Sequence, residues 1–182
     1  MATVSVAMRP RSRQKVAGPV ATPVVFDVNV LVQAIATGNS PYLSWPSPPP
    51  TSGNPFADCL GIINDAAELA LWLSPHILDN TVRVLSAVVG TPKDESEDYR
   101  DILIEMADTS GPGVLSPPRT VHDCHDHEDN LVLDLAAEVG VFLIVSEDID
   151  LTAMSTWRGV PVLRAREFTA RVDGVRRHSR RR

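Results

Sequence analysis

Short apolar runs alternate along the chain with stretches in which apolar residues recur at helical spacing. The apolar runs, each of which predicts a buried strand, cover residues 24–26, 69–73, 141–145 and 160–163. Helical spacing predicts helices over residues 31–38, 54–63, 74–85, 95–106 and 129–139, and another around Glu167. Such an alternation predicts an α/β fold with three layers, in which helices flank a central parallel sheet.

The predicted helices carry recognisable start and stop signals. Asn54 and Ser74 are good N-cap residues, and each is followed by a proline, which suits the first helical position. Gly90 follows the stretch that begins at Ser74, and Gly140 follows the stretch at 129–139, as C-terminal glycines do. These signals fix the boundaries of the predicted elements more closely than periodicity alone.

The pattern also divides the chain into one domain and two flanking segments. Residues 1–22 have no apolar periodicity and are interpreted as a flexible basic lead-in. Residues 39–53 contain five prolines, which exclude a regular element and predict an exposed loop inside the domain. We therefore predict a domain over residues 23–170 and a basic tail over residues 171–182.

The net charge of −6 conceals an uneven distribution. Residues 1–22 sum to +4 and residues 171–182 to +5, which leaves −15 for the rest of the 182-residue chain. The terminal segments either bind phosphate, as nucleic-acid contacts do, or are solvated ends that aid solubility. The first alternative gives five candidate RNA-binding residues: Arg176, Arg177, Arg180, Arg181 and Arg182.

Two further features of composition bear on the protein's location. No stretch approaches the roughly 20 apolar residues of a membrane span, and no apolar run of a signal peptide is present. The two cysteines give no disulfide framework. We expect a cytoplasmic protein without a membrane partner.

Acidic residues follow two of the predicted strands. Asp27 comes directly after the first strand, and Asp148 and Asp150 lie just beyond the strand at 141–145. Asp129 opens a predicted helix between them. Any one of these acids is explained by helix capping, but the carboxyl ends of parallel strands meet at one edge. Converging carboxylates repel one another unless a cation lies among them, so the sequence predicts an Mg²⁺ or Mn²⁺ site.

These residues resemble the motifs of the PIN-domain family, in family order. The matching segments are VFDVNVLV at 25–32, GNP at 53–55, the helix at 74–85, DNLVLDLA at 129–136, SEDIDL at 146–151, and GVPVL at 159–163 with Glu167-Phe168. The resemblance spans residues 23–170. It is nearest to the toxin components of toxin–antitoxin pairs of the VapC type.

The resemblance implies roles for individual residues. Asp27, Asp129 and Asp148 would be the catalytic, metal-binding acids, with Asp150 as a further metal ligand. Asn29 and Ser146 would support the site, together with Asn80 and Asp79 on the helix at 74–85. Two departures from the family pattern are Val28, in place of Ser or Thr, and Asn80, in place of a Glu. Asp79 lies next to Asn80, but neighbouring helix residues point about 100° apart, so it cannot simply replace that Glu.

The function that follows is a metal-dependent endoribonuclease, with RNA as substrate and a cognate antitoxin protein as partner. A homodimer is a further implication of the resemblance. Because the carbonyl oxygen of Asn80 is neutral, metal affinity should fall, which leaves an alternative: a weakened or inactive PIN scaffold that binds RNA or a protein.

A second polar stretch, HDCHDHE at 122–128, allows two interpretations. Its three histidines and one cysteine could bind zinc, although their spacing matches no common structural zinc pattern. The alternative is a polar loop whose acids favour the N-terminus of the following helix.

Overall fold

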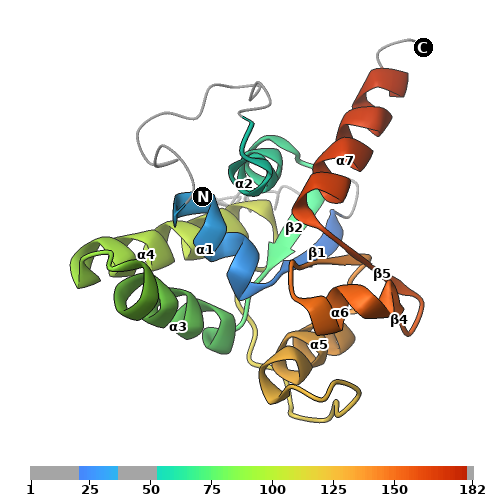
Figure 1. The fold of residues 1–182 in the computed structure, drawn as a ribbon. Coiled ribbons are helices and arrows are strands. Elements are labelled where there is room, and N and C mark those ends of the chain that lie inside the picture. Colours follow the sequence, from blue (N-terminus) through green and yellow to red (C-terminus); the bar gives the residue numbers. More distant parts are fainter. Residues whose placement is uncertain (1–20, 37–52, 180–182) are drawn as a thin grey trace, which may run out of the picture.

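A computed structural model describes residues 21–36 and 53–179 (Figure 1). Most of the predicted lead-in, nearly all of the proline-rich loop and the last three arginines lie outside these residues. The elements in chain order are β1 (Thr22–Phe26), α1 (Val28–Ala36), α2 (Pro55–Asp65), β2 (Leu69–Trp72), α3 (Pro75–Val84), α4 (Lys93–Ser110), α5 (His127–Val139), β3 (Leu143–Val145), α6 (Ile149–Met154), β4 (Thr156–Trp157), β5 (Val160–Leu163) and α7 (Ala165–Ser179).

The five strands form one sheet in the order β2-β1-β3-β5-β4, flanked by helices (Figure 1). β1 pairs in parallel with both β2 and β3, and β3 pairs in parallel with β5. The predicted α/β fold with a central parallel sheet is confirmed. The two-residue strand β4 is added at its edge, antiparallel to β5. β4 was not predicted, because two residues carry no periodicity.

The predicted start and stop signals act as expected. The Asn54 side chain accepts hydrogen bonds from the N–H groups of Phe56 and Ala57, and that of Ser74 accepts one from Ile77. Each such cap contributes about 1 kcal/mol to helix stability. Gly90 and Gly140 have positive φ angles of 84° and 66°, where a side chain would be strained. α3 continues into a π-helical turn, Leu85–Val89, before Gly90 ends it.

The core lies between the sheet and the helices. The last three residues of β1 are fully buried, and the ring of Phe26 packs edge-on against Phe168 of α7, with 5.5 Å between ring centroids. Burying a side chain of this size stabilises the fold by about 1.5–3 kcal/mol. Tyr99 of α4 donates a hydrogen bond to the carbonyl of Leu31 at 2.8 Å, which ties α4 to α1.

The last helix is longer than predicted. α7 runs to Ser179, so residues 171–179 of the predicted tail are helical. None of the described helices is long and apolar enough to cross a membrane.

Candidate metal centre

The carboxyl ends of β1 and β3 lie side by side because the two strands are parallel neighbours in register. Asp27 follows β1, and its N–H donates to the carbonyl of Val145, the last residue of β3, at 2.9 Å. The segment 146–148 follows β3 and leads into α6. The sheet therefore brings two of the predicted acidic positions to one edge, as expected from the strand pattern.

Asp27 is almost completely buried, with 6% of its surface exposed. Its Oδ1 accepts from the N–H of Val28 at 2.6 Å, and its Oδ2 accepts from the Ser146 hydroxyl at 2.6 Å and the Asn29 amide at 2.8 Å. Burial raises the pKa of Asp27; these hydrogen bonds oppose the rise, and the charge of Asp148 adds to it. Since three of about four lone-pair positions are used, Asp27 retains one, on Oδ1, for a cation.

Asn29 and Ser146 connect the two strand ends. The Asn29 carbonyl oxygen accepts from the N–H of Glu147 at 3.0 Å, while its amide nitrogen donates to Asp27. The Ser146 Oγ accepts from the N–H of Asp148 at 2.9 Å while donating to Asp27. Asn29 and Ser146, two of the four predicted supporting residues, therefore lie where they hold Asp27 in one orientation.

Asp129, Asp148 and Asp150 form an oxygen-only cluster beside Asp27. One carboxylate oxygen from each lies within 4.8 Å of the others. The Asp148 Oδ1 also accepts from the N–H of Asp150 at 2.8 Å and so caps α6. Two unit charges about 4 Å apart repel by roughly 4 kcal/mol at an effective dielectric of 20. This repulsion favours a bound cation at the cluster.

The environment of Asp129 reflects the same repulsion. Asp129 is 7% exposed, and burial, followed by the charges of Asp148 and Asp27, raises its pKa to about 7. Hard divalent cations prefer carboxylate oxygens, and they relieve both causes of the shift. The residues present therefore fit Mg²⁺ or Mn²⁺.

The loop before α5 is held in place from two sides. Asn130 accepts from the N–H of Cys124 at 2.9 Å and donates to the carbonyls of Cys124 and Asp126. On the other side, Asp123 accepts from the Trp157 indole at 2.8 Å and pairs with Arg158. The position of Asp129 at the start of α5 thus depends on a fixed loop.

Cys124 lies against the acidic cluster as a protonated thiol. Its Sγ donates to Asp129 Oδ2 at 3.6 Å, and burial, with the neighbouring charge of Asp129, raises the pKa of the thiol to about 12. His122, His125 and His127 are exposed, and within 21–36 and 53–179 the one converging group of metal-type side chains is the Asp129 cluster. Residues 122–126 form a polar loop, and His127 and Glu128 begin α5.

A cleft of about 300 Å³ opens over Asp27, Asp129 and Asp148. Its opposite wall consists of α3. The lining residues come from the start of α1, from α3, from the start of α5 and from the loop before α6: Asp27, Val28, Asn29, Val32, Gln33, His76, Asn80, Arg83, Val84, Asp126, Glu128, Asp129, Val132 and Asp148.

The α3 wall meets α5 through a polar network. Glu128 Oε2 accepts from the Asn80 amide nitrogen and lies 2.9 Å from the Nε2 of His76. Arg83 Nε donates to the Asn80 carbonyl oxygen at 2.9 Å. The neutral Asn80 is thus built into the cleft wall, while Asp79 is exposed and does not line the cleft. His76, Arg83 and Glu128 were not predicted as site residues, because the contact that joins the two walls links Asn80 to Glu128, 48 positions away, and leaves no local pattern.

The predicted RNA-binding arginines are distant from the acidic cluster. α7 begins beside the loop that carries Glu147, whose carboxylate accepts from the N–H of Ala165 at 3.0 Å, and Figure 1 shows the helix rising past α2. Arg176 and Arg177 lie in its last turn, ~20 Å along the axis at 1.5 Å per residue. Arg180, Arg181 and Arg182 lie outside the described residues.

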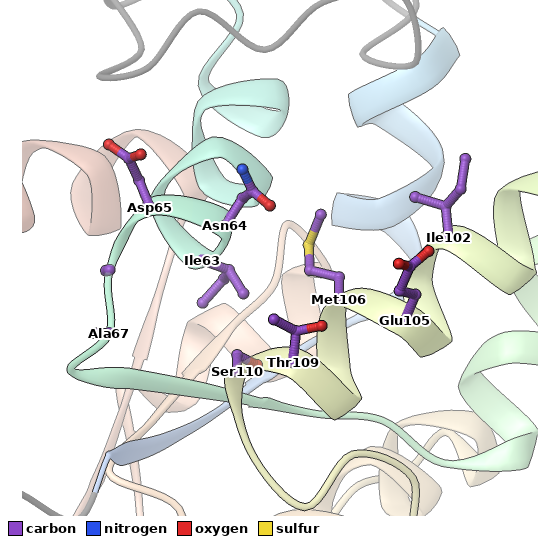
Figure 2. Close-up of a pocket in the computed structure, with 10 residues that line it drawn as sticks. Ile63, Asn64, Asp65, Ala67, Ile102, Glu105, Met106, Thr109 and Ser110 are labelled. Atoms are coloured by element: carbon purple, nitrogen blue, oxygen red, sulfur yellow. The ribbon is translucent and has the colours of Figure 1, made fainter. Parts of the chain in front are cut away.

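A larger hollow of about 530 Å³ lies between the ends of α2 and α4 (Figure 2). Ile63 and Met106 supply part of its apolar lining, and the side chain of Asp65 points away from α4. Its two acidic lining residues, Asp65 and Glu105, form no group of three with other metal-type side chains of the described chain. The smaller cleft is therefore the candidate functional site.

The raised pKa of Asp129 predicts how the stability of the metal-free protein changes with pH. Because the folded state holds this proton up to about pH 7 and the unfolded state releases it near its ordinary value of 3.8, the folded state binds more protons in between. Stability should fall as the pH rises from about 4 to about 7. The measurement is urea unfolding in EDTA at pH 5 and pH 7.5, with Asp129→Asn as control. If the free energy of unfolding of Asp129→Asn changed with pH as much as that of the wild type, Asp129 would not be the group responsible.

Comparison with known proteins adds one result. Residues 23–150, more than two thirds of the chain, match the family model of the PIN domain. No curated protein matches the sequence.

Proposed function

The chain belongs to the PIN-domain family, and from this premise we propose that it is an Mg²⁺- or Mn²⁺-dependent endoribonuclease. PIN domains are generally nucleases that use divalent metals. The observation that carries the proposal is the convergence of Asp129, Asp148 and Asp150 at the carboxyl edge of the sheet, next to the buried Asp27.

Four acidic residues would bind the metal. Asp129, Asp148 and Asp150 offer oxygens that already lie close together, and Asp27 offers its remaining lone pair. A divalent ion at such a site lowers the pKa of a bound water and stabilises the leaving oxygen of a phosphodiester. The oxygen-only donor set favours Mg²⁺ or Mn²⁺ over zinc, which prefers sulfur and nitrogen ligands.

The other residues of the cleft would orient the metal ligands and the substrate. Asn29 and Ser146 fix the Asp27 carboxylate, so that little reorganisation is needed when an ion binds. Arg83, exposed at the α3 wall, adds a positive charge that attracts a phosphate to an otherwise acidic cleft.

We further propose that the protein is the toxin of a toxin–antitoxin pair and acts on cytoplasmic RNA. The sequence resemblance supports this role, together with the basic end of α7, which would hold a longer RNA through its phosphates. An antitoxin partner and a homodimer belong to the same proposal, on the same resemblance.

A PIN scaffold that binds RNA or a protein without cutting is the second candidate. It is favoured by Asn80, a neutral amide in contact with Glu128 and Arg83 in the cleft wall. This candidate predicts RNA binding that weakens steeply with salt, and no dependence of RNA integrity on metal.

Metal removal distinguishes the two candidates. We expect EDTA to abolish cleavage of a mixed single-stranded RNA pool, and added Mn²⁺ or Mg²⁺ to restore it, because the carboxylates alone cannot activate water at neutral pH. The measurement is the rate of RNA fragmentation on a gel. EDTA saturated with Mg²⁺ beforehand controls for effects of the chelator itself. Intact RNA in every condition, with salt-sensitive binding retained, would favour the scaffold.

A further inference from the structure

The Glu128 side chain reaches across the cleft and has no Lys or Arg partner among the described residues. It lines the cleft together with Asp129, and its side chain reaches from α5 to α3, where His76 and Asn80 hold it. Its side chain nevertheless remains 55% exposed. Helix capping does not account for this arrangement, because Asp126 performs that role by accepting from the Glu128 N–H at 2.8 Å.

Two acidic side chains in the loops next to the cluster, neither of which lines the cleft, are paired with arginine. Glu147 pairs with Arg164 at 2.9 Å, and Asp123 pairs with Arg158 at 2.9 Å. Within the described parts of the chain, Glu128 has no Lys or Arg partner; its contacts are an imidazole and an amide. Both contacts are made through Oε2, so among the described residues Oε1 of Glu128 is left available to the cleft.

The α3 wall offers no carboxylate of its own to the cleft. Its lining residues are His76, Asn80, Arg83 and Val84, and the acids of the cluster come from the opposite side. A phosphodiester bound between the two sides needs cationic charge on both the attacking and the leaving oxygen. A carboxylate that reaches the α3 wall would place negative charge on the side of the cleft that the Asp129, Asp148 and Asp150 cluster does not reach.

We propose that Glu128 is a further metal-binding carboxylate of this site, presented on the α3 wall by His76 and Asn80. The inference rests on the proposed function, since it assigns a ligand to the same centre. Asn80 is then a presenting group for Glu128, and the carboxylate that the α3 wall lacks comes from the neighbouring α5.

The test measures Mn²⁺ binding by calorimetry, in the absence of RNA, on the full chain. Glu128→Gln retains the shape and the acceptor oxygen but removes the charge, and we expect its affinity for Mn²⁺ to fall roughly tenfold or more. Glu138→Gln removes an equal charge from an exposed position on the same helix and should leave affinity within twofold. Adding Asn80→Glu to Glu128→Gln returns a carboxylate to the α3 wall and should recover most of the lost affinity.

Two outcomes would overturn the inference alone. The first is equal Mn²⁺ affinity in wild type and Glu128→Gln. The second is a difference between them that disappears in 1 M KCl, where the Debye length is about 3 Å, because a long-range charge effect is screened and coordination is not. Absence of Mn²⁺ binding by the wild type would instead overturn the proposed function and this inference with it.

Discussion

Asp148→Asn is expected to reduce metal-dependent RNA cleavage by ~10³-fold or more, equivalent to about 4 kcal/mol of transition-state stabilisation. Asp148 contributes to the cluster with Asp129 and Asp150 and lines the cleft. The fold should be unaffected, because Asn caps a helix as well as Asp does and its oxygen can still accept from the N–H of Asp150. The measurements are kcat/KM on a defined RNA and the melting temperature in EDTA.

An exposed acid outside the cleft provides the control for this variant. Asp98→Asn on α4 also removes one negative charge, and its cleavage rate should equal that of the wild type. Growth arrest on expression should follow the same order if the protein is a toxin: present in wild type and Asp98→Asn, and lost in Asp148→Asn. Full cleavage by Asp148→Asn would remove Asp148 from the catalytic site.

Asp27→Asn is expected to lose both activity and stability. Both Asp27 oxygens accept hydrogen bonds, from Val28 on one side and from Ser146 and Asn29 on the other. An Asn side chain must turn its NH₂ group toward one of these donors, which leaves buried donors unsatisfied at a cost of about 1–3 kcal/mol. For a chain of this size, each kcal/mol lowers the melting temperature by roughly 2–4 °C.

The measurement for Asp27→Asn is the urea midpoint together with the cleavage rate, in parallel with Asp148→Asn. We expect equal losses of cleavage in the two variants but a lower midpoint in Asp27→Asn alone. An unchanged midpoint would mean that the hydrogen bonds around Asp27 contribute little to folding. Because Asp27→Asn is also expected to lose stability, its loss of cleavage is weaker evidence of a catalytic role than the same loss in Asp148→Asn.

Much of the fold follows from local rules that act within a few residues. The caps at Asn54 and Ser74 and the C-terminal Gly90 and Gly140 bound helices much as predicted, since each satisfies backbone groups next to it. α6 and β4 were missed because six and two residues are too short for a period to be visible. The backbone between α6 and β5 turns at Ser155 and Arg158, which have positive φ angles. Neither residue type favours a positive φ angle, so the sequence does not predict these turns.

The candidate site was predictable only in part, because some of its contacts join residues far apart in the sequence. Acids that follow parallel strands share an edge, so the proximity of Asp27 and Asp148 could be expected from the strand pattern. The contact of Glu128 with Asn80 depends on how α5 packs beside α3, and no local signal encodes that packing. Asp134 is a similar case: it is 2% exposed and accepts from the backbone N–H groups of Thr120 and Val121, a role that its position in the sequence does not suggest.

The long separation between the two halves of the centre has a consequence for protein synthesis. Ser146 and Asp27, which share a hydrogen bond, are 119 positions apart, and β1 meets β3 only after the intervening helices have been made. A nascent chain that has not yet exposed its residues up to Asp150 holds Asp27 without the partners that would complete the cluster. Under the proposed function, the growing polypeptide would therefore be unable to cleave RNA before these residues have emerged.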